Sequence, residues 1–262
     1  MTEASFLDVE LRRPDLRRRF PRRFRQRLVG QTVLELTRRA KYLLATLSSR
    51  ETLLIHLGMS GSFSVDTPTA AQGASAPAQR DPHDHVVFRM SSGAVIAYND
   101  PRRFGLMDLL RPRDAATHPV LSRLGPEPLS PSFDGAALAN ACRGKTTSLK
   151  GALLDQRVVA GLGNIYVVEA LHRAGLSPRR RASTIATPSG VPRDSAHRVA
   201  AAIKQVLREA IARQERPQAY RSSRFHVYDR EGQPCRRAHC DGVVTRLAQG
   251  GRSTFYCPVC QR

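Results

Sequence analysis

Short stretches of apolar residues, or of alternating apolar and polar residues, occupy much of the first part of the chain. Runs of this kind, bounded by Gly, Pro, Asn, Asp and Ser, are typical of β-strands. The predicted strands span residues 7–11, 31–36, 42–47, 52–57, 85–90 and 94–98. We therefore predict a β-rich N-terminal domain over residues 1–112.

At about residue 115 the pattern changes to one with helical spacing. Helices are predicted over residues 132–143, 150–156, 164–174 and 194–214. In the last of these, Val199, Ile203, Val206 and Ala210 follow one another at three- or four-residue spacing and form one apolar face. Residues 115–216 are therefore predicted to form a helical domain.

Two segments of the first domain lack a regular pattern. Residues 12–27 are rich in arginine and form either a solvated, partly helical face or a surface that contacts phosphates. The pattern does not decide between these two interpretations. Residues 68–82 are rich in Ala, Pro, Gly and Gln, a composition that predicts a flexible loop.

The cysteines are concentrated at the end of the chain. Four of the five form two pairs with four and two intervening residues, and sixteen residues separate the pairs. Two short knuckles joined by a hairpin are the usual frame of a tetrahedral zinc site. His239 lies inside the first knuckle, but four cysteines already complete the shell. We predict a finger over residues 224–262 that holds one structural Zn²⁺ through Cys235, Cys240, Cys257 and Cys260; Cys142 has no assigned role.

A hairpin turn is predicted between the two knuckles, at Gly250-Gly251. Arg252 follows directly, which places a guanidinium at the hairpin tip, where it can reach a phosphate or a groove of DNA. The alternative is a finger with a structural role only.

The charge of the chain points to a polyanionic partner. Lys plus Arg number 42 against 22 Asp plus Glu, which gives a formal net charge of +20. Almost all of the cations are arginines, which favours nucleic acid over a membrane surface, although a GC-rich genome also raises the arginine content. No apolar run predicts a membrane-spanning helix and no secretory signal is visible. The cysteine spacing suggests a reducing, cytoplasmic environment.

Four motifs together resemble one protein family. They are LIHLGMSGSF at residues 54–63, NDPRRFG at 99–105, GLGNIYVVE at 161–169 and GRSTFYCPVCQR at 251–262. In this order they closely resemble bacterial formamidopyrimidine-DNA glycosylases, which remove 8-oxoguanine and ring-opened purines. Related endonuclease VIII enzymes share the helical motif and the finger, but NDPRRFG is similar to the formamidopyrimidine branch.

The resemblance implies an α+β multidomain fold with an N-terminal β-sandwich, a helix–two-turn–helix domain and a C-terminal zinc-binding β-hairpin finger. It also implies a monomeric, nucleoid-associated bacterial enzyme that binds damaged double-stranded DNA. Such an enzyme excises the oxidised base and nicks the strand by β and δ elimination, as a glycosylase and abasic-site lyase.

The same resemblance implies roles for individual residues. A flipped-out base leaves a gap in the duplex, which apolar and arginine side chains fill. Glu169 is expected to help position the substrate, and Lys41 and Arg252 are expected to be catalytic. The residues expected to bind DNA are Met59, His83, Arg102, Phe104, Lys145 and Asn164.

The chain departs from the family pattern in two places. The family nucleophile is an N-terminal proline followed by Glu, whereas this chain begins Met1-Thr2-Glu3 without that proline and its helix. Three interpretations stay open: a start codon assigned too late, an amine of Thr2 that substitutes together with Glu3, or a homologue that binds damaged DNA without cutting it. The segment between Arg213 and Phe225 is also shorter than the family's base-closing loop, so the lesion preference is open.

Overall fold

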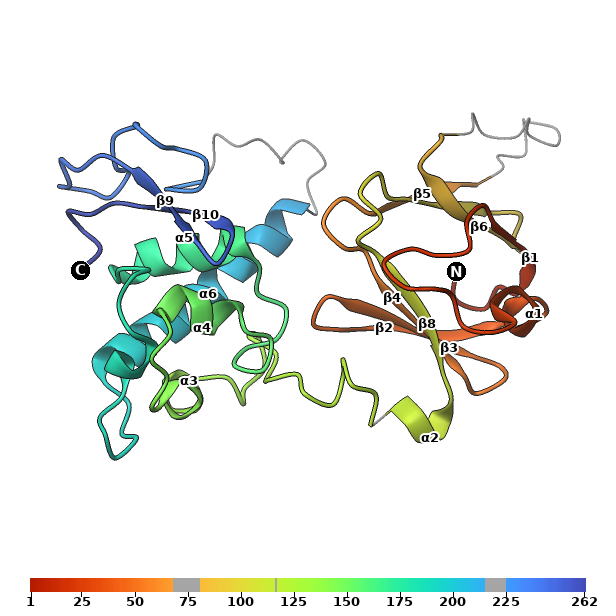
Figure 1. Cartoon of the computed structure of the whole chain (residues 1–262), viewed down its shortest axis with the longest axis horizontal. Coiled ribbons are helices and arrows are strands. Elements are labelled where there is room, and N and C mark those ends of the chain that lie inside the picture. The colour runs from red at the N-terminus through yellow and green to blue at the C-terminus, as the bar shows by residue number, and fades with distance from the viewer. Residues whose placement is uncertain (68–80, 116, 215–224) are drawn as a thin grey trace. The chain divides into compact units, whose positions relative to one another are not determined.

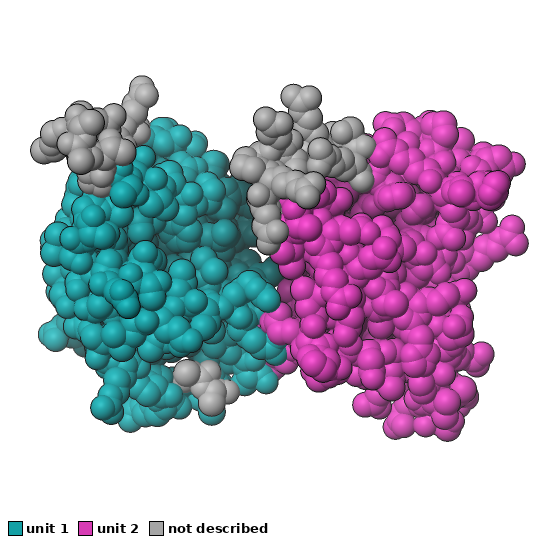
Figure 2. All heavy atoms as spheres, turned by 180° about the vertical axis from the view of Figure 1, so that it is seen from behind, with its two compact units in different colours: residues 1–122 teal, residues 123–262 magenta. Residues whose placement is uncertain are grey.

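The computed structural model describes residues 1–67, 81–115, 117–214 and 225–262. The chain divides into two compact units, residues 1–122 and residues 123–262, which Figure 2 shows in two colours. The finger belongs to the same unit as the helices. Each unit has its own apolar core.

Unit 1 is a sandwich of two antiparallel four-stranded sheets, with strand orders β1-β6-β7-β5 and β2-β3-β4-β8 (Figure 1). The strands are β1 (Phe6–Leu11), β2 (Val33–Arg39), β3 (Tyr42–Leu47), β4 (Thr52–His56), β5 (Ser62–Asp66), β6 (Asp84–Met90), β7 (Val95–Asn99) and β8 (Leu106–Leu110). Apolar side chains from both sheets, such as Val9 and Phe88 from one and Ala45 and Leu53 from the other, form a single buried core. The predicted β-sandwich is confirmed.

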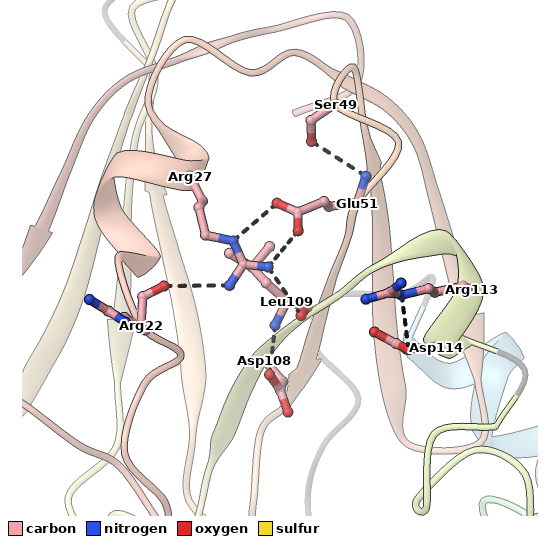
Figure 3. A network of polar contacts seen from close by, with 8 residues as sticks. All are labelled: Arg22, Arg27, Ser49, Glu51, Asp108, Leu109, Arg113 and Asp114. Carbon is pink, nitrogen blue, oxygen red and sulfur yellow. Dashed lines mark hydrogen bonds and ion pairs between the residues drawn. The ribbon is translucent and has the colours of Figure 1, made fainter.

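The arginine-rich segment ends in a short helix, α1 (Phe24–Leu28), whose Phe24 and Leu28 are buried in the sandwich core. Arg27 of this helix points to Glu51 and to the carbonyl of Leu109 (Figure 3), with Nε 3.2 Å from Glu51 Oε2 and Nη2 3.4 Å from Leu109 O. At least this arginine is therefore structural, because its guanidinium connects α1 to Glu51, directly before β4, and to the backbone of β8.

Unit 2 contains the helices α3 (Gly135–Cys142), α4 (Leu149–Leu154), α5 (Asn164–Ala174) and α6 (Asp194–Gln214), with a 3-10 turn η1 (Ala182–Ile185). The side chains of Asp134 and Ser148 cap α3 and α4 by accepting hydrogen bonds from backbone amides of the first turn. Helix α5 ends at Gly175, whose φ of 69° is a left-handed conformation that glycine adopts at low cost.

The finger is built on the hairpin of β9 (Thr245–Gln249) and β10 (Arg252–Tyr256). Gly250 and Gly251 both have positive φ, 56° and 71°, which is the conformation of a type I′ turn. The hairpin packs on α5 through a small apolar cluster of Val168, Val227, Val244 and Phe255.

Several segments differ from the prediction or lie beyond what the structure describes. Strands β5 and β8, the 3-10 turn η1 and the short helix α2 (Pro112–Ala115) were not predicted. The predicted flexible loop falls largely on residues 68–80, and the shortened loop falls on residues 215–224; both lie outside the described residues. Among the described helices, none has the length and apolar character needed to cross a bilayer.

Candidate nucleic-acid interface and metal centre

The four cysteines of the finger converge on one point. The Sγ atoms of Cys235 and Cys260 lie 3.7 Å apart, as do those of Cys240 and Cys257, and all four lie within 4.8 Å of one another. A tetrahedron with Zn–S bonds of about 2.3 Å has S–S edges of about 3.8 Å, so this geometry fits one Zn²⁺. His239 is exposed and lies outside the group of four ligands.

The metal centre is connected to helix α5 by its neighbours. His172 Nε2 lies 3.2 Å from Cys235 Sγ, and the backbone N–H of Arg237 lies 3.4 Å from the same sulfur. Burial, followed by the charge of Arg237, lowers the pKa of His172 to about 4. A neutral imidazole with its proton on Nε2 can donate a hydrogen bond to a metal-bound thiolate at this position. Burial raises the pKa of the Cys235 and Cys260 thiols, and a bound cation is what stabilises them as thiolates.

At the other end of α5, three groups meet beside the hairpin tip. The amide of Asn164 donates to Ser253 O at 3.0 Å. Lys150, which is fully buried, donates to Thr254 Oγ1 at 2.6 Å and lies 3.4 Å from Ser253 O. Arg252 is exposed at the turn. The structure therefore brings Asn164 and Arg252 together in unit 2, with Lys150 beneath the strand that carries Arg252.

In unit 1, three loops meet at one end of the sandwich. Met59 and Phe104 display their side chains to solvent, with 70% and 41% exposure. The guanidinium of Arg102 lies over the Phe104 ring at 4.7 Å from its centroid. His83 is exposed on the turn before β6, and its carbonyl accepts a hydrogen bond from Asp100 N. Two apolar side chains and an arginine thus protrude together. Side chains of these types can insert between stacked base pairs.

Lys41 occupies the exposed turn between β2 and β3. Burial, followed by the charges of Lys41 and Arg17, lowers the pKa of His56. The neutral His56 accepts a hydrogen bond from Gly58 N through Nδ1 at 3.0 Å. The ring of His56 also packs against that of Tyr42, the residue after Lys41, at 5.0 Å between centroids, so His56 connects the Lys41 turn to the loop of Met59.

Two residues singled out in the sequence occupy other positions in unit 2. Lys145 lies in the turn after α3, where its backbone N–H and carbonyl bond to Cys142 O and Ser183 N. Glu169 is 6% exposed, and its carboxylate accepts from the backbone amides of His226, Val227 and Tyr228 at 2.9 Å each. Its carboxylate is therefore engaged in holding the segment that enters the finger.

Sequence reasoning missed His56, Asp100 and Lys150. All three are polar side chains that hydrogen-bond to loops or strands carrying exposed residues. Asp100 and Lys150 are fully buried. His56 and Asp100 have one sequence signal, which is their position inside the LIHLGMSGSF and NDPRRFG motifs. Lys150 lies outside the motifs and has no such signal.

Comparison with known protein families finds a match for each of the three predicted domains. Profiles of the formamidopyrimidine-DNA glycosylase N-terminal domain, the formamidopyrimidine-DNA glycosylase H2TH domain and the zinc finger found in FPG and IleRS match residues 1–107, 124–221 and 232–262. The chain is 56% identical to the formamidopyrimidine-DNA glycosylase of Rhodopseudomonas palustris strain BisB18, over 100% of this chain and 94% of the relative. It is 51% identical to that of Methylocella silvestris, with the same coverage.

Solved structures give the same result. The Lactococcus lactis formamidopyrimidine-DNA glycosylase bound non-covalently to DNA containing an abasic site superposes with a TM-score of 0.84 at 27% identity, covering 100% of this chain and 94% of the other. Its complex with DNA containing FAPY-dG superposes with a TM-score of 0.85, at the same identity and coverage. The expected architecture of sandwich, helical domain and zinc finger is confirmed.

Proposed function

The chain belongs to the formamidopyrimidine-DNA glycosylase family, and on that premise we propose that it excises oxidised purines, 8-oxoguanine and formamidopyrimidines, from double-stranded DNA. The observation that carries this proposal is the full-length match at 56% identity, in which all three family modules follow in order. The net charge of +20 suits a duplex substrate. The bacterial relatives support action near the nucleoid, and we propose that the protein acts as a monomer.

The second part of the proposal is abasic-site lyase activity. An amine attacks C1′ of the damaged nucleotide, and the C1′–N bond to the base breaks as the base takes up a proton. The C1′–O4′ bond then breaks, O4′ takes up a proton, and the opened sugar is left joined to the amine as an imine. Loss of a C2′ proton then breaks the bond from C3′ to the 3′ phosphate. Loss of a C4′ proton breaks the bond from C5′ to the 5′ phosphate. The resemblance assigns the amine to the N-terminal residue and the second elimination to Arg252.

Excision requires that the damaged nucleotide leave the stack, because its C1′ is out of reach inside a duplex. In this proposal Met59, Arg102 and Phe104 fill the vacated space. Their exposure and the position of the Arg102 guanidinium over Phe104 support this role. Apolar and arginine side chains inserted between bases offset part of the cost of unstacking.

The remaining residues are proposed to hold the backbone of the DNA. Asn164 begins α5, where free backbone amides favour a phosphate. His83 and Lys145 contact the DNA at other positions, and Lys41 lies near the phosphate of the lesion. The Zn²⁺ that Cys235, Cys240, Cys257 and Cys260 hold supplies a structural cross-link of the finger and no chemistry at the DNA.

Borohydride trapping tests the enzyme proposal directly. The zinc-loaded protein is incubated with a duplex that contains 8-oxoguanine opposite cytosine, in the presence of sodium borohydride, and base release is measured in parallel by chromatography. We expect free 8-oxoguanine and a covalent protein–DNA complex. Proteolysis and mass spectrometry should place the sugar adduct on the N-terminal amine and not on Lys41.

The outcomes separate the two parts of the proposal. Tight binding to the lesion duplex with neither base release nor adduct would overturn the glycosylase function. Base release without an adduct or a nick would overturn only the lyase activity. An undamaged duplex of the same sequence serves as the control and should give neither product.

A further inference from the structure

One buried carboxylate joins the three loops of unit 1 that carry the protruding side chains. Asp100 follows β7 directly and is fully buried. Its Oδ1 accepts from Ser60 Oγ at 2.7 Å, in the loop of Met59. Its Oδ2 accepts from Gly105 N at 2.8 Å, at the end of the loop of Arg102 and Phe104, and from the Tyr98 hydroxyl at 3.0 Å.

The backbone of the same residue extends the connection to the third loop. Asp100 N donates to His83 O at 3.0 Å, and Asp100 O accepts from Arg103 N at 3.1 Å. The buried ring of His85 also contacts Asp100 O, with Nε2 at 2.9 Å. A single residue therefore holds the turn of His83, the loop of Met59 and the loop of Arg102 and Phe104.

The loops also interlock sterically. A Cβ added to Gly58 would lie 2.6 Å from the carbonyl carbon of Phe104, and one added to Gly61 would lie 2.5 Å from the Tyr98 hydroxyl oxygen. A Cβ on Gly105 would overlap the same hydroxyl. Gly58 has a φ of 73°, a conformation that a side chain would also strain. The backbones of the two loops are thus in direct contact at Gly58 and Phe104.

We propose that Asp100 is a positioning residue that fixes Met59, His83, Arg102 and Phe104 in one arrangement before DNA binds, with Ser60 as its essential partner. The inference rests on the proposed function, because it concerns how the wedge is prepared for a damaged duplex. Loops ordered in advance do not lose conformational entropy when they bind, so the preference for a lesion is larger than loops ordered on contact would allow.

The chemistry of the hydrogen bonds supports a fixed arrangement. The groups that donate to the carboxylate are neutral hydroxyls and backbone amides, and hydrogen bonds to an ionised acceptor are about twice as strong as neutral ones. Burial by itself raises the pKa of Asp100, but the hydrogen bonds from Ser60, Gly105 and Tyr98 outweigh it and hold the pKa below its usual value. The carboxylate is therefore ionised near neutral pH.

The first experiment measures loop order in the free protein by amide hydrogen exchange. Ser60→Ala removes the hydroxyl that bonds to Asp100 but makes no change in the loop of Phe104. We expect exchange to rise about tenfold in residues 101–105 as well as in residues 57–61, as the loss of one hydrogen bond to a charged group implies. Ser60→Thr keeps a hydroxyl and should restore protection. Ser64→Ala, in exposed β5, is the matched control and should leave exchange unchanged.

The second experiment measures binding of the same variants to an abasic-analogue duplex and to an intact duplex. Ser60→Ala loses the hydrogen bond to Asp100, so it should bind the abasic-analogue duplex about tenfold more weakly relative to the intact duplex. Its affinity for the intact duplex should stay within about twofold of that of the unmodified protein. Asp100→Asn should act in the same direction, and thermal unfolding checks that each variant is folded.

The two failures are distinguishable. If the unmodified protein shows no preference for the damaged duplex, the proposed function fails. If it shows the preference and folded Ser60→Ala retains both the preference and the protection of residues 101–105, this inference is overturned. A parallel fall of both affinities together with the melting temperature would also overturn it, because that pattern indicates a general structural role.

Discussion

At the scale of single residues, Lys150 is an ammonium group that is shielded from solvent. It is held by Thr254 Oγ1 and by the carbonyl of Ser253, directly beside the exposed Arg252. Burial, followed by the charge of Arg252, lowers its pKa from 10.5 to about 8. A group whose pKa is lower in the folded state than in the unfolded state penalises folding while it is charged. The hydrogen bonds from Lys150 to β10 offset part of the cost of burying this charge.

This depressed pKa predicts a pH dependence of stability. Between pH of about 8 and 10.5 the unfolded chain binds a proton at Lys150 that the folded chain has lost, so stability rises with pH across that window. We expect the free energy of unfolding of the zinc-loaded protein, measured with urea, to increase between pH of about 7.5 and 9.5, and to increase more than that of Lys150→Met. Arg252→Ala removes the neighbouring charge and should reduce the gain. If the free energies of unfolding of the wild type and of Lys150→Met change equally with pH, the prediction is contradicted.

Sequence patterns predicted the displayed residues better than the residues that support them. Met59, Arg102 and Phe104 were singled out through the resemblance of their motifs to the family, and Arg252 because it follows a Gly-Gly turn; their roles in DNA binding stay predictions. Asp100 and Lys150 were missed, since a single buried polar residue has no periodicity, and each has a partner distant in sequence, Ser60 for Asp100 and Thr254 for Lys150. Lys150 contacts a residue more than one hundred positions away, and no local pattern records such a contact.

At the scale of elements, helix α5 is fastened to the finger along its whole length. Asn164 at its start bonds to Ser253 O, and Glu169 in its middle holds residues 226–228. At its end, the guanidinium of Arg237 donates to the carbonyls of His172 and Arg173. The apolar cluster between helix and finger is small. These polar contacts therefore fix the finger on the helix.

Glu169→Gln tests this arrangement. One of the three backbone amides that face the carboxylate would then face an NH₂ group instead, which should cost about 1–3 kcal/mol of stability. We expect faster amide exchange at residues 226–228 and faster zinc release to a chelator. Glu209→Gln is the control, because Glu209 forms a half-exposed ion pair with Arg173 and surface pairs contribute about 0–1 kcal/mol. Equal effects of the two variants would argue against a special role of Glu169.

The elements themselves were predictable where one face is buried. Helix α6 has the predicted bounds because its apolar positions repeat with a helical period, and strand β3 and helix α5, which lack a single period, also have the predicted bounds. Strand β5 was missed because it is a largely exposed edge strand, with its neighbour on one side only. Strand β8 is buried on both faces and therefore lacks the alternation that reveals a strand.

At the scale of the whole molecule, the dominant property is its positive charge. The net charge of +20 comes almost entirely from arginine, and the structure uses part of it internally, as in the ion pairs of Arg25 with Asp8 and Arg27 with Glu51. The charge alone therefore did not indicate which arginines contact DNA. Those proposed to do so are exposed at a turn, as Arg252 is, or lie over an aromatic ring, as Arg102 does.

The salt dependence of binding distinguishes these arginines. The logarithm of the association constant for a duplex should fall linearly with the logarithm of salt concentration, by about 0.9 per neutralised phosphate. Arg252→Ala should therefore reduce the slope by about 1 and weaken binding on damaged and intact duplexes alike. Arg113→Ala removes an exposed charge for which we propose no contact with DNA, and it should leave the slope unchanged. If both variants change the slope equally, the positive charge acts as a diffuse field, and the hairpin tip is not a contact point.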